Sequence, residues 1–147
     1  MIIPKESIRF RIIANSNEKK DQELKYKIVS NLNTELNNQT NIINARNEIK
    51  NRIPEITTSV QNTLNQEKSK QNFQIKYGLN YFPEKEYKGI KYEAGEYESL
   101  VITLGNGLGE NFWCVLFPPL CLLETTDNNS TEVEYSSLVK EIIDKYF

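Results

Sequence analysis

The chain has 147 residues, a formal net charge of −2 and no histidine. A chain of this length can bury one hydrophobic core, so we expect a single domain over residues 1–147. The small negative charge provides no basic field that would capture nucleic acid or an anionic membrane. The lack of histidine excludes the Ser/His/Asp and Cys/His catalytic arrangements and the HExxH zinc site, and two cysteines alone cannot complete a tetrahedral metal site. We therefore expect no metal and no cofactor.

The chain begins with a predicted strand and a predicted helix. Ile8, Phe10 and Ile12 alternate with two arginines, a period of two that is typical of a strand with one buried face. Asparagine and serine residues then supply turn and capping chemistry. Apolar residues follow at four-residue steps, which predicts an amphipathic helix over residues 21–37.

A second helical region contains a proline. It follows an asparagine-rich break at residues 37–41, and its apolar residues are again spaced for one face. Proline is poorly tolerated inside a helix but suits the first turn of one. We therefore expect one helix to end near Arg52 and another to begin at Pro54, with a single kinked helix as the competing interpretation.

Beyond residue 72 the sequence predicts strands. Phe73, Ile75 and Tyr77 begin an alternation with polar residues that runs toward Phe82 and is ended by Pro83. A strand in this position would have one buried face and one polar face.

Two further strands are expected over residues 97–104 and 112–117. The connection between them is short, so the simplest arrangement joins them as an antiparallel hairpin. A last amphipathic helix is expected over residues 138–147. The predicted fold class is therefore α+β, a mostly antiparallel sheet of about four strands covered by three helices plus a C-terminal helix.

The sequence GNGLG at residues 105–109 has two interpretations. A glycine-rich loop cradles phosphate when it follows a strand and opens a helix, because the helix amides then point at the anion. Here the following ENFWCVLF is typical of a strand, and Glu110 would repel phosphate. A plain hairpin loop is therefore favoured.

The six glutamates between residues 84 and 110 could supply the carboxylate pair that glycosidase chemistry needs. Their spacing does not indicate that any two face each other, and an acidic run in a loop is usually solvated. The aromatic residues of the same region could stack bases or sugars, but aromatics are also favoured in strands. With a net negative charge, packing in a core or an interface is the favoured role.

The two cysteines leave three alternatives. Cys114 and Cys121 could form a disulfide in an oxidising compartment, with Pro118 and Pro119 turning the chain between them. They could equally be two reduced thiols packed in the core, or one could be a reactive or intermolecular thiol. None of these alternatives makes an enzyme without further groups.

Three long and separated blocks carry a resemblance to a known family. They are IRFRIIANSNEKKDQELK at residues 8–25, YGLNYFPEKEYKGIKYEAGEYESL at 77–100 and GNGLGENFWCVLFPPLC at 105–121. In this order they resemble the stage II sporulation protein R family over nearly the whole chain. Phe112 stands where many members have a second tryptophan, so an aromatic residue is retained.

The resemblance implies an intercompartmental signalling protein of endospore formation and not an enzyme. Such a protein is exported from the forespore into the space between the two membranes that separate it from the mother cell. There it activates a membrane-embedded aspartic protease that processes pro-sigma-E. The implied partner is this protease, which places the domain near the membrane, and no nucleic acid or small-molecule substrate is implied. Family members carry an N-terminal export or membrane segment, and we expect it to be absent from this chain.

We expect the contact with the protease on the segments YFPEKEY and FWCVLFPPLC, because exposed aromatic residues beside proline-fixed backbone make good anchors. The candidate contact residues are Tyr81, Phe82, Pro83, Glu84, Tyr87, Phe112, Trp113, Cys114, Phe117, Pro118, Pro119 and Cys121. In the alternative interpretation, Trp113, Val115 and Phe117 point inward and serve only the core. A runner-up function is a thiol- or carboxylate-dependent hydrolase acting on cell-wall material, and a third is a structural module with no protease partner.

Overall fold

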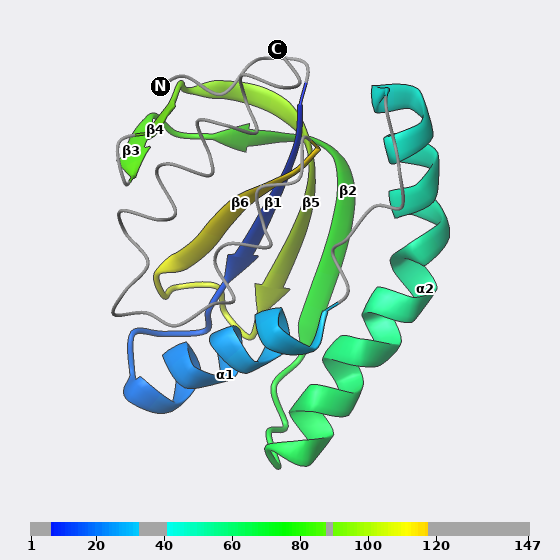
Figure 1. Ribbon diagram of the computed structural model, residues 1–147. Helices are drawn as coiled ribbons and strands as arrows, with labels where there is room; N and C mark the ends of the chain where they lie inside the picture. The colour runs from blue at the N-terminus through cyan, green and yellow to red at the C-terminus, as the bar shows by residue number, and fades with distance from the viewer. Residues whose placement is uncertain (1–6, 33–40, 88–89, 118–147) are drawn as a thin grey trace.

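The computed structural model of the protein describes residues 7–32, 41–87 and 90–117 (Figure 1). Within them, four strands form one sheet in the order β2-β5-β1-β6, and two short strands form a separate hairpin. The elements in chain order are β1 (Ile8–Ile13), α1 (Lys19–Asn31), α2 (Ile42–Gln66), β2 (Phe73–Phe82), β3 (Lys85–Tyr87), β4 (Ile90–Tyr92), β5 (Gly95–Leu104) and β6 (Asn111–Phe117). The predicted α+β class is confirmed.

The sheet is mixed because β1 lies between β5 and β6. It runs parallel to β5, with Phe10 opposite Leu100, and antiparallel to β6, with Phe10 opposite Cys114. The prediction that β5 and β6 form a hairpin was therefore wrong. Strands that flank a third strand lie about 10 Å apart, and the connection over residues 105–110 can reach about 20 Å when extended. It is thus long enough to step over the end of β1.

Both helices pack on the same face of the sheet. The main core joins Leu24 and Ile28 of α1 to Ile49 and Val60 of α2 and to the even-numbered positions of β1, β5 and β6. Burying these apolar side chains is the main term that holds the two layers together. The helix predicted over residues 21–37 is found as α1, which begins two residues earlier and ends at Asn31.

Helix α2 is continuous through Pro54, so the predicted break at this residue was wrong. Its buried stripe includes Ala45 and Ile49 before the proline and Ile56 and Val60 after it. An interior proline costs about 3 kcal/mol, whereas a fully buried aliphatic side chain contributes about 1.5–3 kcal/mol. A stripe on both sides of Pro54 therefore outweighs the single lost hydrogen bond.

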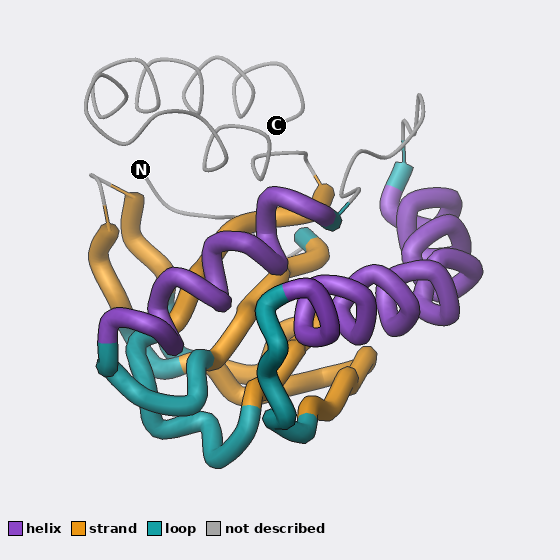
Figure 2. The backbone as a smooth tube through the Cα atoms, turned by 90° about the horizontal axis from the view of Figure 1, so that it is seen from below, coloured by secondary structure: helices purple, strands orange, loops and turns teal. Residues whose placement is uncertain are grey.

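The strands β2 and β5 lie where the alternating patterns predicted them. β2 ends at Phe82, directly before Pro83, and pairs with β5 along its whole length. Figure 2 shows the C-terminal end of α2 returning through a short loop to the start of β2. The β3–β4 hairpin between β2 and β5 was not predicted, and the helix predicted over residues 138–147 lies outside the described residues. Neither described helix combines the length and apolar character needed to cross a membrane.

Candidate partner-contact surface

The structure divides the predicted contact residues into an exposed and a buried group. Tyr81, Pro83 and Glu84 are exposed at the end of β2 and in the loop that follows it. The buried members, all less than 9% exposed, are Phe82, Phe112, Trp113, Cys114 and Phe117. Tyr87 lies in β3. Pro118, Pro119 and Cys121 lie outside the described residues.

The run of residues 112–117 is buried on both of its faces. Phe112 and Cys114 belong to the core beneath the helices, whereas Trp113 belongs to a smaller cluster on the opposite face of the sheet. This burial agrees with the interpretation in which Trp113, Val115 and Phe117 serve the core. A role of these residues in partner contact stays a prediction.

Of the three alternatives for the cysteines, the described residues exclude those in which Cys114 is a free thiol. Cys114 is 1% exposed and is not a free thiol. Because Cys121 lies outside the described residues, its pairing with Cys114 stays a prediction.

Buried Arg9, half-buried Arg11 and three aromatic rings fix the end of β2. The Arg9 guanidinium carbon lies 3.6 Å from the centre of the Tyr97 ring and 5.5 Å from that of Phe82. The Arg11 guanidinium carbon lies 4.7 Å from the Trp113 ring and 5.6 Å from that of Phe82. Phe82 therefore contacts both cations, and such contacts contribute about 2 kcal/mol when they are desolvated. Phe82 anchors the end of the strand that carries Tyr81 and that is followed directly by Pro83.

The alternation of β1 did not indicate this cluster. Arg9 is 1% exposed, although its position between apolar residues predicted a polar face. Burial lowers the pKa of Arg11 below its ordinary value, yet a guanidinium remains charged in proteins. The aromatic partners come from β2, β5 and β6, which are distant in sequence, so no local pattern could have shown that they meet.

A cavity of 440 Å³ lies at the same end of the sheet, on the face that carries the helices. Its walls come from the first turns of α2, the last residues of β2 and the start of β5. The lining residues are Ser7, Ile42, Arg46, Leu79, Ala94, Gly95, Glu96, Tyr97 and Glu98.

An ion pair joins α2 to the sheet inside this cavity. Arg46 donates from Nε to Glu98 Oε2 at 2.6 Å and from Nη2 to Glu98 Oε1 at 2.8 Å, which is a bidentate geometry. The Tyr77 hydroxyl also donates to Glu98. The hydrogen bond from Arg46 is the largest effect on the pKa of Glu98, and together with the Tyr77 hydroxyl it outweighs burial and holds that pKa below its usual range. Burial, followed by this hydrogen bond to Glu98, raises the pKa of Tyr77.

This ion pair bears on the hydrolase interpretation. A general acid of the glycosidase type needs a carboxyl group with a raised pKa, and the pKa of Glu98 is shifted in the opposite direction. Glu98 is therefore engaged in a structural contact between α2 and β5.

Three exposed apolar side chains lie on the two elements, α2 and β2, that contribute residues to the cavity lining. Ile43 is 60% exposed, Leu79 71% and Tyr81 62%. We call these three residues the β2–α2 patch. Ile43 follows the lining residue Ile42, Leu79 itself lines the cavity, and Tyr81 lies opposite the lining residue Glu96 in the strand register. Clustering of exposed apolar side chains beside a cavity is more informative than isolated ones.

The glycine-rich loop at the other end of the sheet leaves no backbone amide for a phosphate. Its amide groups donate to main-chain carbonyls of the neighbouring segments or to asparagine side chains at 2.7–3.1 Å. The acceptors for residues 105 to 110, in order, are the Asn72 carbonyl, Asn15 Oδ1, the Leu104 carbonyl, the Asn15 carbonyl, the Ala14 carbonyl and Asn17 Oδ1. A phosphate cradle needs amides that point at the anion. The loop instead ties β5 and β6 to the end of β1.

Asp21 holds the turn that accepts these bonds. Its carboxylate accepts from Ser16 Oγ at 2.6 Å, from Asn15 Nδ2 at 3.0 Å and from Gln71 Nε2 at 2.7 Å. Burial raises the pKa of Asp21, but these three hydrogen bonds outweigh burial and hold the pKa below its usual range. Lys25 adds a further bond, from Nζ to the Glu110 carbonyl at 3.0 Å.

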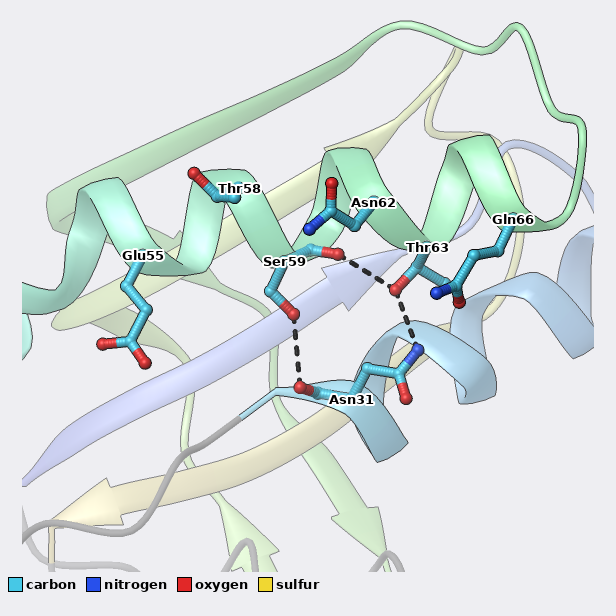
Figure 3. Close-up of a pocket in the computed structure, with 7 residues that line it drawn as sticks. All are labelled: Asn31, Glu55, Thr58, Ser59, Asn62, Thr63 and Gln66. Atoms are coloured by element: carbon cyan, nitrogen blue, oxygen red, sulfur yellow. Dashed lines mark hydrogen bonds between the residues drawn. The ribbon is translucent and has the colours of Figure 1, made fainter.

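A second groove, of 510 Å³ and lined by polar residues, lies between the end of α1 and the C-terminal half of α2 (Figure 3). Ser59 Oγ donates to the Asn31 carbonyl at 3.2 Å, and Asn31 Nδ2 donates to Thr63 Oγ1 at 2.9 Å. Among the described residues of its lining, Glu55 is the one that carries a charge. These bonds connect the two helices, so the Ser59 and Thr63 hydroxyl groups are engaged in structural contacts.

Comparison with known proteins gives a family and a relative. The profile of the family described as stage II sporulation protein R matches residues 4–127. Stage II sporulation protein R of Bacillus subtilis (strain 168) is 40% identical over 136 residues, which cover 90% of this chain. The chain spans 61% of the length of that relative. No solved structure matches this chain.

The fold and the surface define an α+β domain with an apolar patch beside a cavity, and no cluster of potential metal ligands occurs among its described residues. The chain belongs to the stage II sporulation protein R family. The resemblance carried by its three sequence blocks is thereby confirmed, and it supports a role in sporulation.

Proposed function

We propose that this domain is an intercompartmental signal in endospore formation. It is exported from the forespore into the space between the two membranes, where it activates the membrane-embedded aspartic protease that processes pro-sigma-E in the mother cell. The observation that carries the proposal is the family match over residues 4–127, supported by 40% identity to a stage II sporulation protein R.

Activation requires the domain to bind the active state of the protease more tightly than the inactive state. Moving such an equilibrium from 1:99 to 99:1 needs a difference in affinity of about 10⁴-fold. The active state in this proposal is a competent dimer or conformation of the protease. Exposed anchors on a rigid frame suit this task, because little entropy is lost when they bind.

The exposed members of the predicted contact set support a surface of this kind. Exposed Tyr81 and Pro83 flank Phe82, whose contacts with two arginines hold the end of β2. The alternative of a cell-wall hydrolase finds little support, because Cys114 is 1% exposed and is not a free thiol. The pKa of Glu98 is also lowered, which does not suit a general acid.

The test is co-expression of the domain, fitted with an export signal, with the protease and pro-sigma-E in a host that does not sporulate. We expect pro-sigma-E to be cleaved when all three are present and to remain intact without the domain. A catalytically inactive protease is the control. Cleavage that proceeds equally without the domain would overturn the proposal.

A further inference from the structure

The apolar side chains on one face of β2 extend beyond the part of the strand that packs beneath the helices. Phe73, Ile75 and Tyr77 pack against the core beneath the helices. The register with β5 continues without a shift through residue 82, so Leu79 and Tyr81 extend the same face. Both are exposed.

The face of β2 that is more buried changes at Gly78. Before it, the odd-numbered residues of β2 are the more buried ones. After it, Asn80 and Phe82 are the more buried. They lie on the face of the sheet that carries Tyr97 and Trp113, opposite the helices. The last part of β2 is therefore held by its even-numbered residues, which leaves its odd-numbered apolar side chains for another molecule.

β2 is also an edge strand of the sheet. In the order β2-β5-β1-β6, it has a strand partner on one side only among the residues that the structure describes. An exposed edge with apolar side chains is a template for pairing with another chain, and natural proteins usually protect it with charges or proline. Exposed Lys76 lies before Gly78, and Pro83 and Glu84 lie beyond the strand, so the stretch with Leu79 and Tyr81 carries neither a charge nor a proline.

The cavity beside this edge has one uncompensated charge. Of its three charged lining residues, Arg46 and Glu98 neutralise each other in the bidentate pair. The third, Glu96, is exposed and forms no ion pair with any described residue. It lies directly opposite Tyr81. An apolar wall with a carboxylate at its rim fits a lysine or arginine side chain, whose apolar stem packs while its charged end stays wet.

We propose that an extended segment of the partner protease pairs along the end of β2, packing apolar side chains on Leu79 and Tyr81 and a basic side chain against Glu96. Main-chain hydrogen bonds to a sheet edge give affinity in this mode of recognition, and alternate side chains give specificity. We assign a basic side chain to this segment because the charged residues that line the cavity have a net negative charge. This inference rests on the proposed function and assigns its contact to one surface.

The test measures binding of purified domain variants to the detergent-solubilised protease. Leu79→Lys and Tyr81→Lys each place a charge on the β2–α2 patch. Each is expected to weaken binding by about tenfold or more, as for a central anchor. Leu108→Lys is the matched control, because Leu108 is 78% exposed at the opposite end of the sheet. Its affinity should stay within about twofold of the wild type, the usual range for a surface change outside a contact.

The basic side chain is tested at Glu96 separately. Glu96→Gln should weaken binding and reduce its dependence on salt, because a screened ion pair is removed. Glu96→Lys should weaken binding further. Circular dichroism and thermal unfolding of each variant check that the fold is retained, since these side chains are exposed.

The outcomes separate this inference from the proposed function. If the wild type binds and activates the protease and the Leu79, Tyr81 and Glu96 variants do so equally, the surface is wrong and the function stands. If the wild type does not bind the protease, both fall. If the wild type is a dimer that Leu79→Lys dissociates, a second copy of this chain occupies the β2–α2 patch. The inference is then overturned.

Discussion

At the scale of single residues, neighbours in the sequence have opposite roles. Phe82 is buried between Arg9 and Arg11, whereas Tyr81 beside it is 62% exposed. A sequence motif such as YFPEKEY therefore contains both the anchor and the presented surface. The alternation of a strand is enough to separate them, because successive side chains point to opposite faces.

This division predicts a difference between two substitutions. Phe82→Ala should lower the free energy of unfolding by about 3–5 kcal/mol, the usual loss for a buried aromatic. Tyr81→Ala should change it by less than about 0.5 kcal/mol. Urea denaturation of both variants measures the difference. Equal stability of the two variants would contradict the anchoring role of Phe82.

Asp21 predicts how stability depends on pH. Its pKa is lowered in the folded state, so its contribution is present above the unfolded value of about 3.9 and is lost as pH falls through the folded pKa. Wild-type stability should therefore decline as pH falls below about 5. In Asp21→Asn, this decline should be smaller and stability at pH 7 lower. Urea midpoints at several pH values test this, and parallel curves for the two proteins would contradict it.

At the scale of elements, the loop over residues 105–110 allows β1 to lie between β5 and β6. It crosses the end of β1 and its amides bond to residues 14–17, among other acceptors. Gly109 makes this crossing possible, because a Cβ atom there would lie 2.3 Å from the Ser16 carbonyl oxygen. The backbone segments approach too closely for any side chain.

Gly109→Ala should therefore lower the free energy of unfolding by about 1–3 kcal/mol, the typical cost of overpacking. Gly78→Ala is the comparison, because a Cβ atom there would have no neighbour within 4 Å and only the backbone conformation is strained. Thermal unfolding of both variants separates the two effects. No loss of stability in Gly109→Ala would contradict the close crossing.

Pro54 gives a second prediction for an element. Pro54→Ala restores the amide that α2 lacks at this position, and alanine is the best helix former. The gain is opposed by the freer unfolded chain, so we expect a net increase of about 1–2 kcal/mol in the free energy of unfolding. A decrease, measured by urea denaturation, would show that the packing of α2 requires proline.

Local patterns in the sequence predicted most elements but not their arrangement. The alternations of residues 8–12 and 73–79 located β1 and β2, and the four-residue spacing from Leu24 located α1. The insertion of β1 between β5 and β6 depends on pairing between distant segments, which no local period encodes.

For the candidate site, the sequence indicated Tyr81, Pro83 and Glu84 but missed Leu79, Ile43 and Glu96. Leu79 and Glu96 line the same cavity as residues at the start of α2, and this proximity exists only in the folded chain.

At the scale of the whole molecule, the two ends of the sheet differ in character. One end is closed by the hydrogen-bonded loop and the Asp21 turn. The other end has the β2–α2 patch, the cavity and an uncompensated carboxylate. A weak net charge of −2 adds little long-range steering. The proposed recognition of the protease therefore depends on a local surface and not on the overall charge.

The central claim is that this domain activates the protease directly. The measurement that tests it most directly is the rate of pro-sigma-E cleavage by the protease reconstituted in lipid vesicles, as purified domain is added. We predict a rate that rises and saturates with the concentration of the domain, and a weaker response with Leu79→Lys than with Leu108→Lys. A rate that does not depend on the domain, with a protease shown to be competent, would contradict the account.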